Sequence, residues 1–340
     1  MVGVWRYILI FAFLVVSTIA NGQDIKYSSP IVNNAEPNAL ENDFKAVISK
    51  VKDRLLDAPE ATYLYLAHWI ELYNHENILP ETAALQLPPR PEKIDNFTPK
   101  QNWEPNGYPV VSPEWGLGMP FSFADPARFR PPTPPTHGPI FEKDIKDVLL
   151  YGDAYSEVRT PEQSLIAAFW ANGIGTETPP GRWNIIALEE SRHLPHAERV
   201  NLMLKLNIAL YDAGIAAWDS KYHYSYWRPQ SAISKTYSLY ADWQPMMQPP
   251  FHPEYVSGHS AFSGAAAKVL EDYLGPRKFC ITAPELANLQ RCFDSFTQAA
   301  NEAGQSRIYG GIHYDFSNQA GLKLGRDVAA HVLSTVNLTR

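Results

Sequence analysis

Apolar residues recur at helical spacing along most of the chain, whereas strict alternation of apolar and polar residues is rare. Leu64, Ala67, His68 and Leu72, for example, follow a period of about 3.6 residues. Such spacing predicts helices over 41–56, 60–75, 143–151, 161–171, 183–190, 195–220, 259–274, 289–304 and 318–336. No alternating stretch is long enough for a sizeable sheet. We therefore expect an all-α fold whose C-terminal half is a helical bundle.

Proline interrupts this pattern between the first two predicted helices and the rest. The chain has 29 prolines, and they concentrate between residues 80 and 140. Proline lacks a backbone N–H and breaks helices, so this region is predicted to be an irregular wrap. We divide the chain into a signal segment over 1–22, an N-terminal helical and proline-rich segment over 23–142, and a helical-bundle domain over 143–340 that holds the candidate chemistry.

The first residues have the three parts of a secretory signal. Arg6 supplies positive charge, residues 8–16 form an apolar run, and the stretch from Thr18 to Ala20 offers a cleavage site. The apolar run is short for a membrane span. We expect cleavage and a secreted or periplasmic protein with no remaining membrane contact; an uncleaved anchor is the alternative.

The chain has two cysteines, Cys280 and Cys292, and an exported protein enters an oxidising compartment in which they can form a disulfide. We favour a disulfide between them, with two free buried thiols as the alternative. The triplets beginning at Asn96 and Asn337 match the glycosylation sequon.

The charge balance excludes a dominant basic surface. The net charge is −7, with 19% charged and 45% hydrophobic residues, which is usual for a globular protein. Tyr222, Tyr224 and Tyr226 alternate beside a basic segment and resemble a base-stacking platform. The acidic balance argues against that interpretation, and we expect no nucleic-acid partner.

The first segment with candidate chemistry contains Lys221 and Arg228. Seven residues on a helix turn through about 700°, so the two side chains share a face if the helix beginning near residue 195 extends that far. Pro229 disfavours helix at Arg228, which should therefore lie at the helix end. Two cations there suit a charged ligand; a solvated basic face is the alternative.

The second segment contains Ser257, Gly258 and His259 before an apolar helical run that Gly275 and the following proline end. Ser257 or Ser260 caps the helix. A helix N-terminus binds anions through unpaired backbone N–H groups, and glycine permits close approach. His259 is then a proton donor beside the anion. The alternative is an ordinary capped helix with a surface histidine.

The third segment contains Arg307 and His313 and is expected to follow a helix that Gly304 ends. Gly310 and Gly311 indicate a bent or closely approached backbone. The guanidinium of Arg307 matches oxyanion geometry, and the imidazole of His313 can bind a metal or attack phosphorus. A histidine buried for structural reasons is the alternative.

Together the three segments read Lys-x6-Arg-Pro, Ser-Gly-His and Ser-Arg-x5-His. This order resembles the signature of the vanadium-dependent haloperoxidases and the type 2 phosphatidic acid phosphatase superfamily. Residues 179–184, 212–214 and 306–315 also resemble the haloperoxidase branch, and the likeness covers roughly residues 145–336. It implies a helical bundle, a vanadate cofactor, and hydrogen peroxide, halide and small organic acceptors as partners.

The resemblance also implies a role for each residue. The oxyanion would be held by three cations and by donors at the helix start: Lys221, Arg228, Arg307, Ser257 and Gly258. His259 would act as the acid–base group, and His313 would bond vanadium directly. Three cations in a water-poor site neutralise such an anion far better than water does.

The chain departs from the pattern at two positions. Val256 stands where many members have proline before Ser-Gly-His, which changes no catalytic atom. Ser317 stands where the phosphatases often have an aspartate that orients the last histidine, so the partner of His313 is open. Acidic candidates to support His259 or Arg307 are Glu162, Asp212 and Asp315.

Trp218 and His252 are candidates for a halide pocket. Trp218 precedes Lys221 by three residues, where chloroperoxidases of the family have tryptophan; core packing is the alternative. His252 precedes His259 by seven, where bromoperoxidases resemble one another in histidine and chloroperoxidases in phenylalanine. We therefore favour bromide or iodide, although a slip of one residue, to Phe251, would reverse the choice.

Two other functions stay open. One is a soluble acid phosphatase with a phosphohistidine at His313; the other is a secreted protein that only binds an anion and does not require His259 or His313. For His193 and His196 we favour a solvated loop over a zinc site, because no third ligand is evident. Oligomeric state is also open, and a homo-oligomer is compatible with the sequence.

Overall fold

The computed structural model describes residues 39–77, 79, 83–99, 102–105 and 109–338, so the expected signal over 1–22 lies outside the described residues. The chain begins with two helices, α1 (Ala39–Asp53) and α2 (Ala58–Glu76). The proline-rich stretch that follows is irregular apart from the short 3-10 helices η1 (Pro113–Leu117) and η2 (Pro126–Phe129).

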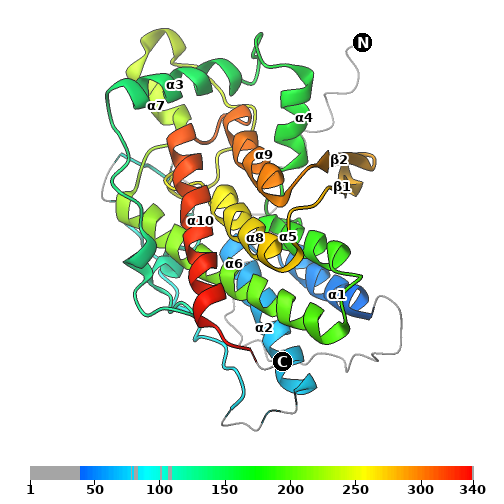
Figure 1. Ribbon diagram of the computed structural model, residues 1–340. Helices are drawn as coiled ribbons and strands as arrows, with labels where there is room; N and C mark the ends of the chain where they lie inside the picture. Colours follow the sequence, from blue (N-terminus) through cyan, green and yellow to red (C-terminus); the bar gives the residue numbers. More distant parts are fainter. Residues whose placement is uncertain (1–38, 78, 80–82, 100–101, 106–108, 339–340) are drawn as a thin grey trace.

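The remaining residues are largely helical, which confirms the all-α fold (Figure 1). The helices are α3 (Pro139–Tyr151), α4 (Pro161–Phe169), α5 (Thr178–Glu190), α6 (His196–Tyr224), α7 (Pro229–Thr236), α8 (Gly258–Leu274), α9 (Phe296–Tyr309) and α10 (Asp315–Thr335). Two further 3-10 turns are η3 (Ser238–Tyr240) and η4 (Pro284–Leu286).

Several helices begin where capping residues predict. Thr160 and Gln163 form a reciprocal capping box at α4, and the side chain of Ser257 accepts from the backbone N–H of Ser260 at the start of α8. Helix α8 ends before Gly275, whose φ of 68° places it in the left-handed region. The sequence therefore set both ends of the helix that carries His259.

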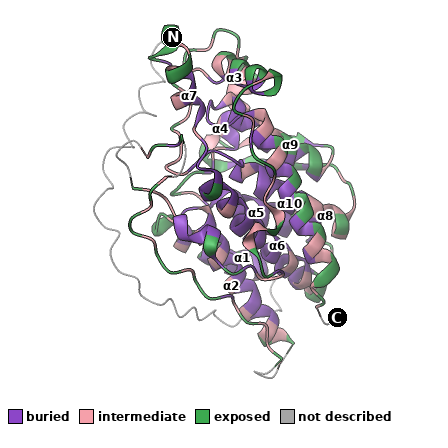
Figure 2. Ribbon diagram, turned by 90° about the vertical axis from the view of Figure 1, so that its left-hand side faces the viewer, coloured by how far each residue is buried: buried purple, intermediate pink, exposed green. Residues whose placement is uncertain are grey.

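Helix α6 is the centre of the molecule. Its 29 residues are buried on nearly all sides, as expected for a helix with apolar residues all round. It packs against α2, α5, α8 and α10, and Figure 2 shows buried residues concentrated in these central helices. Because α2 packs directly on α6, the N-terminal helices share one hydrophobic core with the bundle.

Helices α8 and α10 touch through glycine. A Cβ on Gly325 would lie 2.0 Å from the Ala261 carbonyl oxygen, and one on Gly264 would lie 2.4 Å from that of Leu322. At Gly321 the added atom would lie 2.6 Å from the carbonyl oxygen of Ser257. Backbone contact of this kind leaves little freedom of movement, so α10 fixes the start of α8.

The helix predicted over 289–304 is wrong at its beginning. Strands β1 (Phe279–Ala283) and β2 (Leu289–Phe293) form an antiparallel hairpin, and α9 starts only at Phe296. In β1 buried and exposed residues alternate, and Ala287 and Asn288 have positive φ in the turn. The five-residue strands are too short for alternation to stand out against the neighbouring helical spacing.

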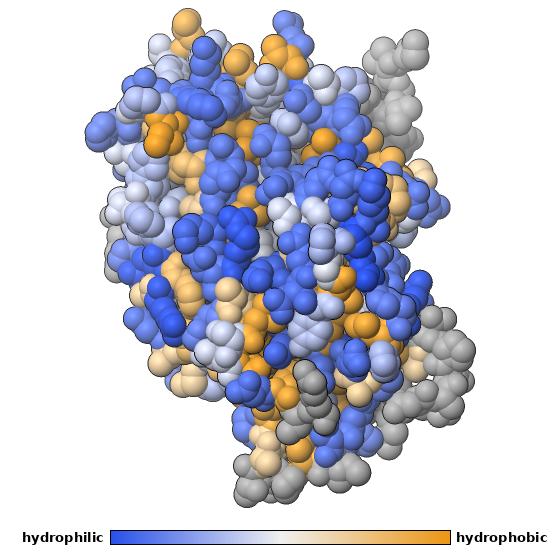
Figure 3. All heavy atoms as spheres, in the orientation of Figure 1, coloured by the Kyte–Doolittle hydropathy of each residue, from blue (hydrophilic) through white to orange (hydrophobic). Residues whose placement is uncertain are grey.

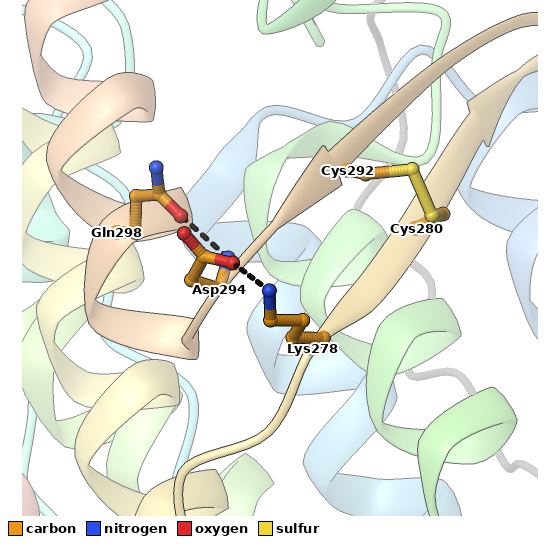
Figure 4. The surroundings of a disulfide bond; sticks show 5 residues. All are labelled: Lys278, Cys280, Cys292, Asp294 and Gln298. Atoms are coloured by element: carbon orange, nitrogen blue, oxygen red, sulfur yellow. Dashed lines mark hydrogen bonds and ion pairs between the residues drawn. A yellow bond between two sulfur atoms is a disulfide. The ribbon is translucent and has the colours of Figure 1, made fainter.

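The hairpin also carries the predicted disulfide, which is confirmed. Cys280 and Cys292 are directly paired across the strands and joined through their sulfur atoms (Figure 4). At the open end of the hairpin, Lys278 Nζ lies 3.0 Å from Asp294 Oδ1. The bond thus holds together the segment between α8 and α9.

Polar side chains cover most of the face shown in Figure 3, and apolar ones are scattered among them. Within the described ranges, no helix has both the length and the apolar character that crossing a bilayer requires.

Candidate oxyanion site

Lys221 and Arg228 do not share a helix face, because the helix does not extend as far as the shared face required. Helix α6 ends at Tyr224 because Ser225 adopts a left-handed conformation with a φ of 43°. Arg228 is extended and caps the start of α7, as its position before Pro229 favours. The chain reverses between the two cations, and both side chains are nevertheless buried in one place.

The ammonium group of Lys221 is enclosed by the segment that leads into α8. Its Nζ donates to the carbonyl oxygens of Pro253 at 3.1 Å, Glu254 at 2.9 Å and Val256 at 2.5 Å. The residue has no exposed surface. Burial, and then the charge of Arg228, lower the pKa of Lys221 well below its usual value.

The guanidinium of Arg228 bridges two loops. Its Nη1 lies 2.8 Å from the Ile312 carbonyl oxygen and 3.1 Å from Nε2 of His313. Its Nη2 lies 3.0 Å from the His252 carbonyl oxygen and 3.1 Å from Nδ1 of the same residue. A guanidinium can only donate, so Nε2 of His313 is an acceptor, whereas Nδ1 of His252 also lies 3.1 Å from the Pro253 carbonyl oxygen and its role depends on the tautomer. Burial lowers the pKa of Arg228 to about 10.

His313 has a partner that the sequence did not identify, Glu254. Its Nδ1 lies 2.7 Å from Glu254 Oε1, which also accepts from the backbone N–H of Tyr314 at 3.2 Å. Burial raises the pKa of Glu254 to about 7, although Arg228 and Lys221 oppose the rise. The signal in the sequence was slight: one acidic residue five positions before His259.

The start of α8 lies directly against α6. A Cβ on Gly258 would meet the Trp218 ring at 3.4 Å and Lys221 Cε at 3.9 Å, so glycine permits this close approach. The Ser257 hydroxyl is 2.8 Å from that of Ser260, which also reaches Asn318 Oδ1 at 2.9 Å.

His259 follows in the first turn of α8 and is partly exposed. Its Nε2 lies 3.2 Å from the carbonyl oxygen of Ala171, in the loop after α4. Burial, and then the charge of Arg307, lower the pKa of His259 well below its usual value. The ring is therefore neutral.

Arg307 lies inside α9, because the helix does not end at Gly304 as expected but continues to Tyr309. Gly304 instead provides space for α10: a Cβ there would lie 1.9 Å from Asn318 Oδ1. Arg307 Nε donates to the Ser306 hydroxyl at 2.9 Å, and Nη2 donates to the Ala167 carbonyl oxygen at 3.0 Å. Burial lowers the pKa of Arg307 to about 9.

Electrostatic coupling shows that the three segments converge. Lys221 and Arg307 both lower the pKa of His259, while Arg228 and Lys221 both lower that of His313 after the larger effect of burial. Among the described residues, no side-chain hydrogen bond or ion pair joins any of the three cations to a carboxylate. Their charges are buried against carbonyl, hydroxyl and imidazole groups, an arrangement that an anion would stabilise.

The two halide-pocket candidates also meet here. The rings of Trp218 and His252 are 5.0 Å apart, so His252 is the residue that packs on the tryptophan. Trp218 is 2% exposed, and its Nε1 finds no hydrogen-bond partner within the described part of the chain. The edge of the indole that faces Gly258 is its six-membered ring, so Trp218 gives this side of the cluster an apolar wall.

The three acidic residues that were candidates to support His259 or Arg307 do not reach this cluster. Asp212 accepts from the backbone of Phe121 and Ser122, Glu162 pairs with Arg291, and Asp315 accepts from Asn318 and Gln319.

The histidine pair of the favoured solvated loop has other neighbours. His196 lies 2.7 Å from Glu76, and no group of three metal-ligating side chains occurs among the residues that the structure describes.

A surface depression adjoins the cluster on the side of α7. Its lining includes Trp103, Gln230, Gln248, Phe251 and Arg228. Arg228 thus belongs both to the buried cluster and to a surface depression.

The sequence and the fold have recognisable relatives. Residues 201–240 and 238–339 match the family described as the VCPO second helical-bundle domain. The vanadium chloroperoxidase of Curvularia inaequalis is 28% identical over 151 residues, which span 36% of this chain and 24% of that protein. The chain therefore matches about a quarter of that relative's length.

Among solved structures, the first bacterial vanadium-dependent iodoperoxidase superposes with a TM-score of 0.63 and 32% identity, over 69% of this chain and 60% of that one. The apo form of a bacterial vanadium-dependent chloroperoxidase gives 0.55 and 18%, over 66% and 55%, which shows a shared fold. Over residues 201–339 the chain is thus similar to the helical-bundle domain of the vanadium-dependent haloperoxidases.

Proposed function

We propose that the protein is a vanadate-dependent haloperoxidase that oxidises halide with hydrogen peroxide to hypohalous acid. The observation that carries the proposal is the buried group of Lys221, Arg228 and Arg307 around His259 and His313. Among the described residues none of the three cations forms a hydrogen bond or ion pair with a carboxylate, and the carboxylate of Glu254 acts on Lys221 and Arg228 only through its charge. The similarity to an iodoperoxidase and a chloroperoxidase supports the proposal.

The donor set fits a tetrahedral oxyanion. The three cations would hold its oxygens, the Ser257 hydroxyl and the Gly258 N–H would add hydrogen bonds, and His313 would supply Nε2 as the ligand to vanadium. When bound, vanadate supplies a Lewis acid that activates hydrogen peroxide toward halide. His259 is neutral and partly exposed, so it is placed to take a proton from the entering peroxide.

For the halide we propose bromide or iodide. His252 contacts both Trp218 and Arg228, so it places a polar ring where a phenylalanine would give an apolar wall. Larger and more easily oxidised halides tolerate such a site. Small organic acceptors would then react with the hypohalous acid.

A second candidate function is a soluble acid phosphatase. The observation in its favour is the Glu254–His313 contact, because a carboxylate on Nδ1 orients and activates Nε2 as a nucleophile. The cations would then stabilise the transferring phosphoryl group, and His259 would protonate the leaving oxygen.

We further propose that the protein is exported. The signal-like segment over 1–22 and the disulfide between Cys280 and Cys292 support this location. The Asn96 side chain is exposed, which leaves that sequon open to glycosylation in a host that glycosylates; the second sequon includes Thr339, outside the described residues.

One purified sample, assayed twice, tests the function. Orthovanadate should elicit peroxide-dependent bromination, and excess phosphate should suppress it by competing for the site. Hydrolysis of a chromogenic phosphomonoester, inhibited by vanadate, would favour the phosphatase instead. His313→Ala should abolish whichever activity is present; if both survive in the variant, the site assignment is wrong.

A further inference from the structure

Glu254 connects three segments of the site although it is not one of its cations or imidazoles. It is fully buried, and its backbone N–H donates to the Tyr226 carbonyl oxygen at 3.0 Å. Its carbonyl oxygen accepts from Lys221, and its carboxylate accepts from His313 and from the backbone of Tyr314. The residue thus ties the segment before α8 to the ends of α6 and α9.

The geometry fixes where the proton of His313 resides. Oε1 of Glu254, a hydrogen-bond acceptor when ionised, lies 2.7 Å from Nδ1, and the guanidinium of Arg228, which can only donate, lies 3.1 Å from Nε2. Both contacts are satisfied only when Nδ1 carries the proton and Nε2 carries the lone pair. The opposite tautomer would break both hydrogen bonds.

We propose that Glu254 is a positioning residue that holds His313 in the Nδ1–H tautomer and presents Nε2 to the bound oxyanion. The proposal deepens the proposed function and rests on it only in naming the oxyanion as the ligand. Ser317, four residues after His313, does not take this place, because Nδ1 of His313 already contacts Glu254, and Ser317 interacts with that same carboxylate and lowers its pKa. The carboxylate comes instead from the loop before α8.

A purely structural role does not explain why a carboxylate is buried at position 254. The side chain is fully buried, and a buried carboxylate is weak evidence for stability. Its Oε1 faces the ring of His313. Outer partners of a metal-binding histidine commonly change metal affinity or activity by about 10- to 100-fold when removed.

The test reads the tautomer directly. Histidine 15N chemical shifts of the full-length protein, with His313 assigned by its loss in His313→Ala, should show a protonated Nδ1 and an unprotonated Nε2 in the wild type. In Glu254→Ala the proton should redistribute toward Nε2, and the affinity for orthovanadate and for inorganic phosphate, measured by calorimetry, should fall by about 10- to 100-fold. Glu254→Gln retains an acceptor at Oε1, so it should keep the tautomer and lose less affinity.

Asp144 offers a matched control. It is also a buried carboxylate, and its Oδ2 accepts from the backbone N–H of Phe316 at 2.6 Å, three residues beyond His313. Asp144→Ala should destabilise the same region and leave the His313 tautomer unchanged.

An Nε2–H tautomer of His313 in the wild type, or an unchanged tautomer in Glu254→Ala, would overturn the proposal. The wild-type measurement remains decisive even if Glu254→Ala does not fold. Absence of both peroxidase and phosphatase activity in the wild type would instead refute the proposed function, and the tautomer result would still decide the role of Glu254.

Discussion

Nη2 of Arg228 lies 3.1 Å from Nδ1 of His252, so the guanidinium that contacts His313 through Nη1 also holds the ring that packs on Trp218. Burial, followed by the charges of Lys221 and Arg228, lowers the pKa of His252 well below its usual value. Nδ1 of His252 also lies 3.1 Å from the carbonyl oxygen of Pro253, so this nitrogen stands between a donor and an acceptor. A change at His252 should reach the anion site through its contacts with Arg228 and Trp218.

His252→Phe removes the contact of the imidazole with Arg228 and makes the pocket wall apolar. We expect the ratio of kcat/KM for bromide to that for chloride to fall about tenfold, which corresponds to about 1.4 kcal/mol. Steady-state peroxidase assays with the two halides measure the ratio. Phe251→Leu is the control, because the neighbouring residue lines the outer cavity and should leave the ratio unchanged. An unaltered ratio in His252→Phe would show that this position does not select the halide.

Arg307→Met should separate stability from anion binding. The wild-type guanidinium is buried, and burial lowers its pKa to about 9, so its charge is unfavourable in the anion-free protein. Methionine has a similar length and no charge, and we expect the anion-free melting temperature to stay the same or rise. Affinity for orthovanadate should fall by about 10- to 100-fold, since a charge-assisted hydrogen bond contributes about 1.5–3 kcal/mol. Calorimetry with and without orthovanadate checks both expectations.

Arg128→Met is a suitable comparison, because Arg128 lies on the surface beside Phe129 and His331, away from the cluster. A large loss of anion-free stability in Arg307→Met, with vanadate affinity preserved, would mean that Arg307 stabilises the fold and does not bind the anion.

Removing the disulfide should affect stability far more than chemistry. The bond closes a short loop with a sequence separation of 12 residues, for which loop entropy predicts a contribution of about 3 kcal/mol. The double variant Cys280→Ser, Cys292→Ser should therefore unfold at lower temperature and keep its affinity for orthovanadate. Thermal unfolding in the presence and absence of a reductant measures the difference. Equal melting temperatures for the oxidised and reduced wild type would contradict the expectation.

The sequence predicted the helices with strong periodicity and clear ends. Helix α8, for example, begins after the serine cap and ends at the glycine stop that its residues indicate. Prediction from the sequence failed where local signals compete with tertiary packing. Gly304 looks like a helix end and is instead an interior residue against Asn318, and the short strand beginning at Leu289 looks like part of the following helix.

The site shows the same division. Lys221, Arg228 and Arg307 were chosen as residue types that suit an oxyanion, and the structure brings them around two imidazoles. Glu254 was not chosen, because its role follows from a contact with His313 across 59 residues of sequence. The local pattern shows only an acidic residue shortly before His259 and not its contact with His313, and the acidic candidates that were chosen pair elsewhere.

His68, far from this site, gives a pH-dependent prediction that does not depend on the proposed function. The ring is fully buried on α2 against Phe44 and Trp69, and burial lowers its pKa from 6.5 to about 3. Asp43 Oδ2 lies 3.4 Å from Nε2, and burial also raises the pKa of that carboxyl, so desolvation disfavours the charged form of both groups. The folded protein thus keeps His68 neutral over a range in which the unfolded chain protonates it.

Between pH 6.5 and about 3, the unfolded state therefore binds one proton more at this residue, and the free energy of unfolding falls as the pH is lowered. The contribution is at most about 1.4 kcal/mol per pH unit. His68→Gln should make the acid side of the stability profile shallower by up to that amount, whatever its effect at neutral pH. Denaturant unfolding at a series of pH values measures the slope, and His75→Gln, an exposed position on the same helix, should leave it unchanged. Parallel profiles for the wild type and His68→Gln would mean that His68 is already charged in the folded protein, and the pairing with Asp43 would then be an ion pair.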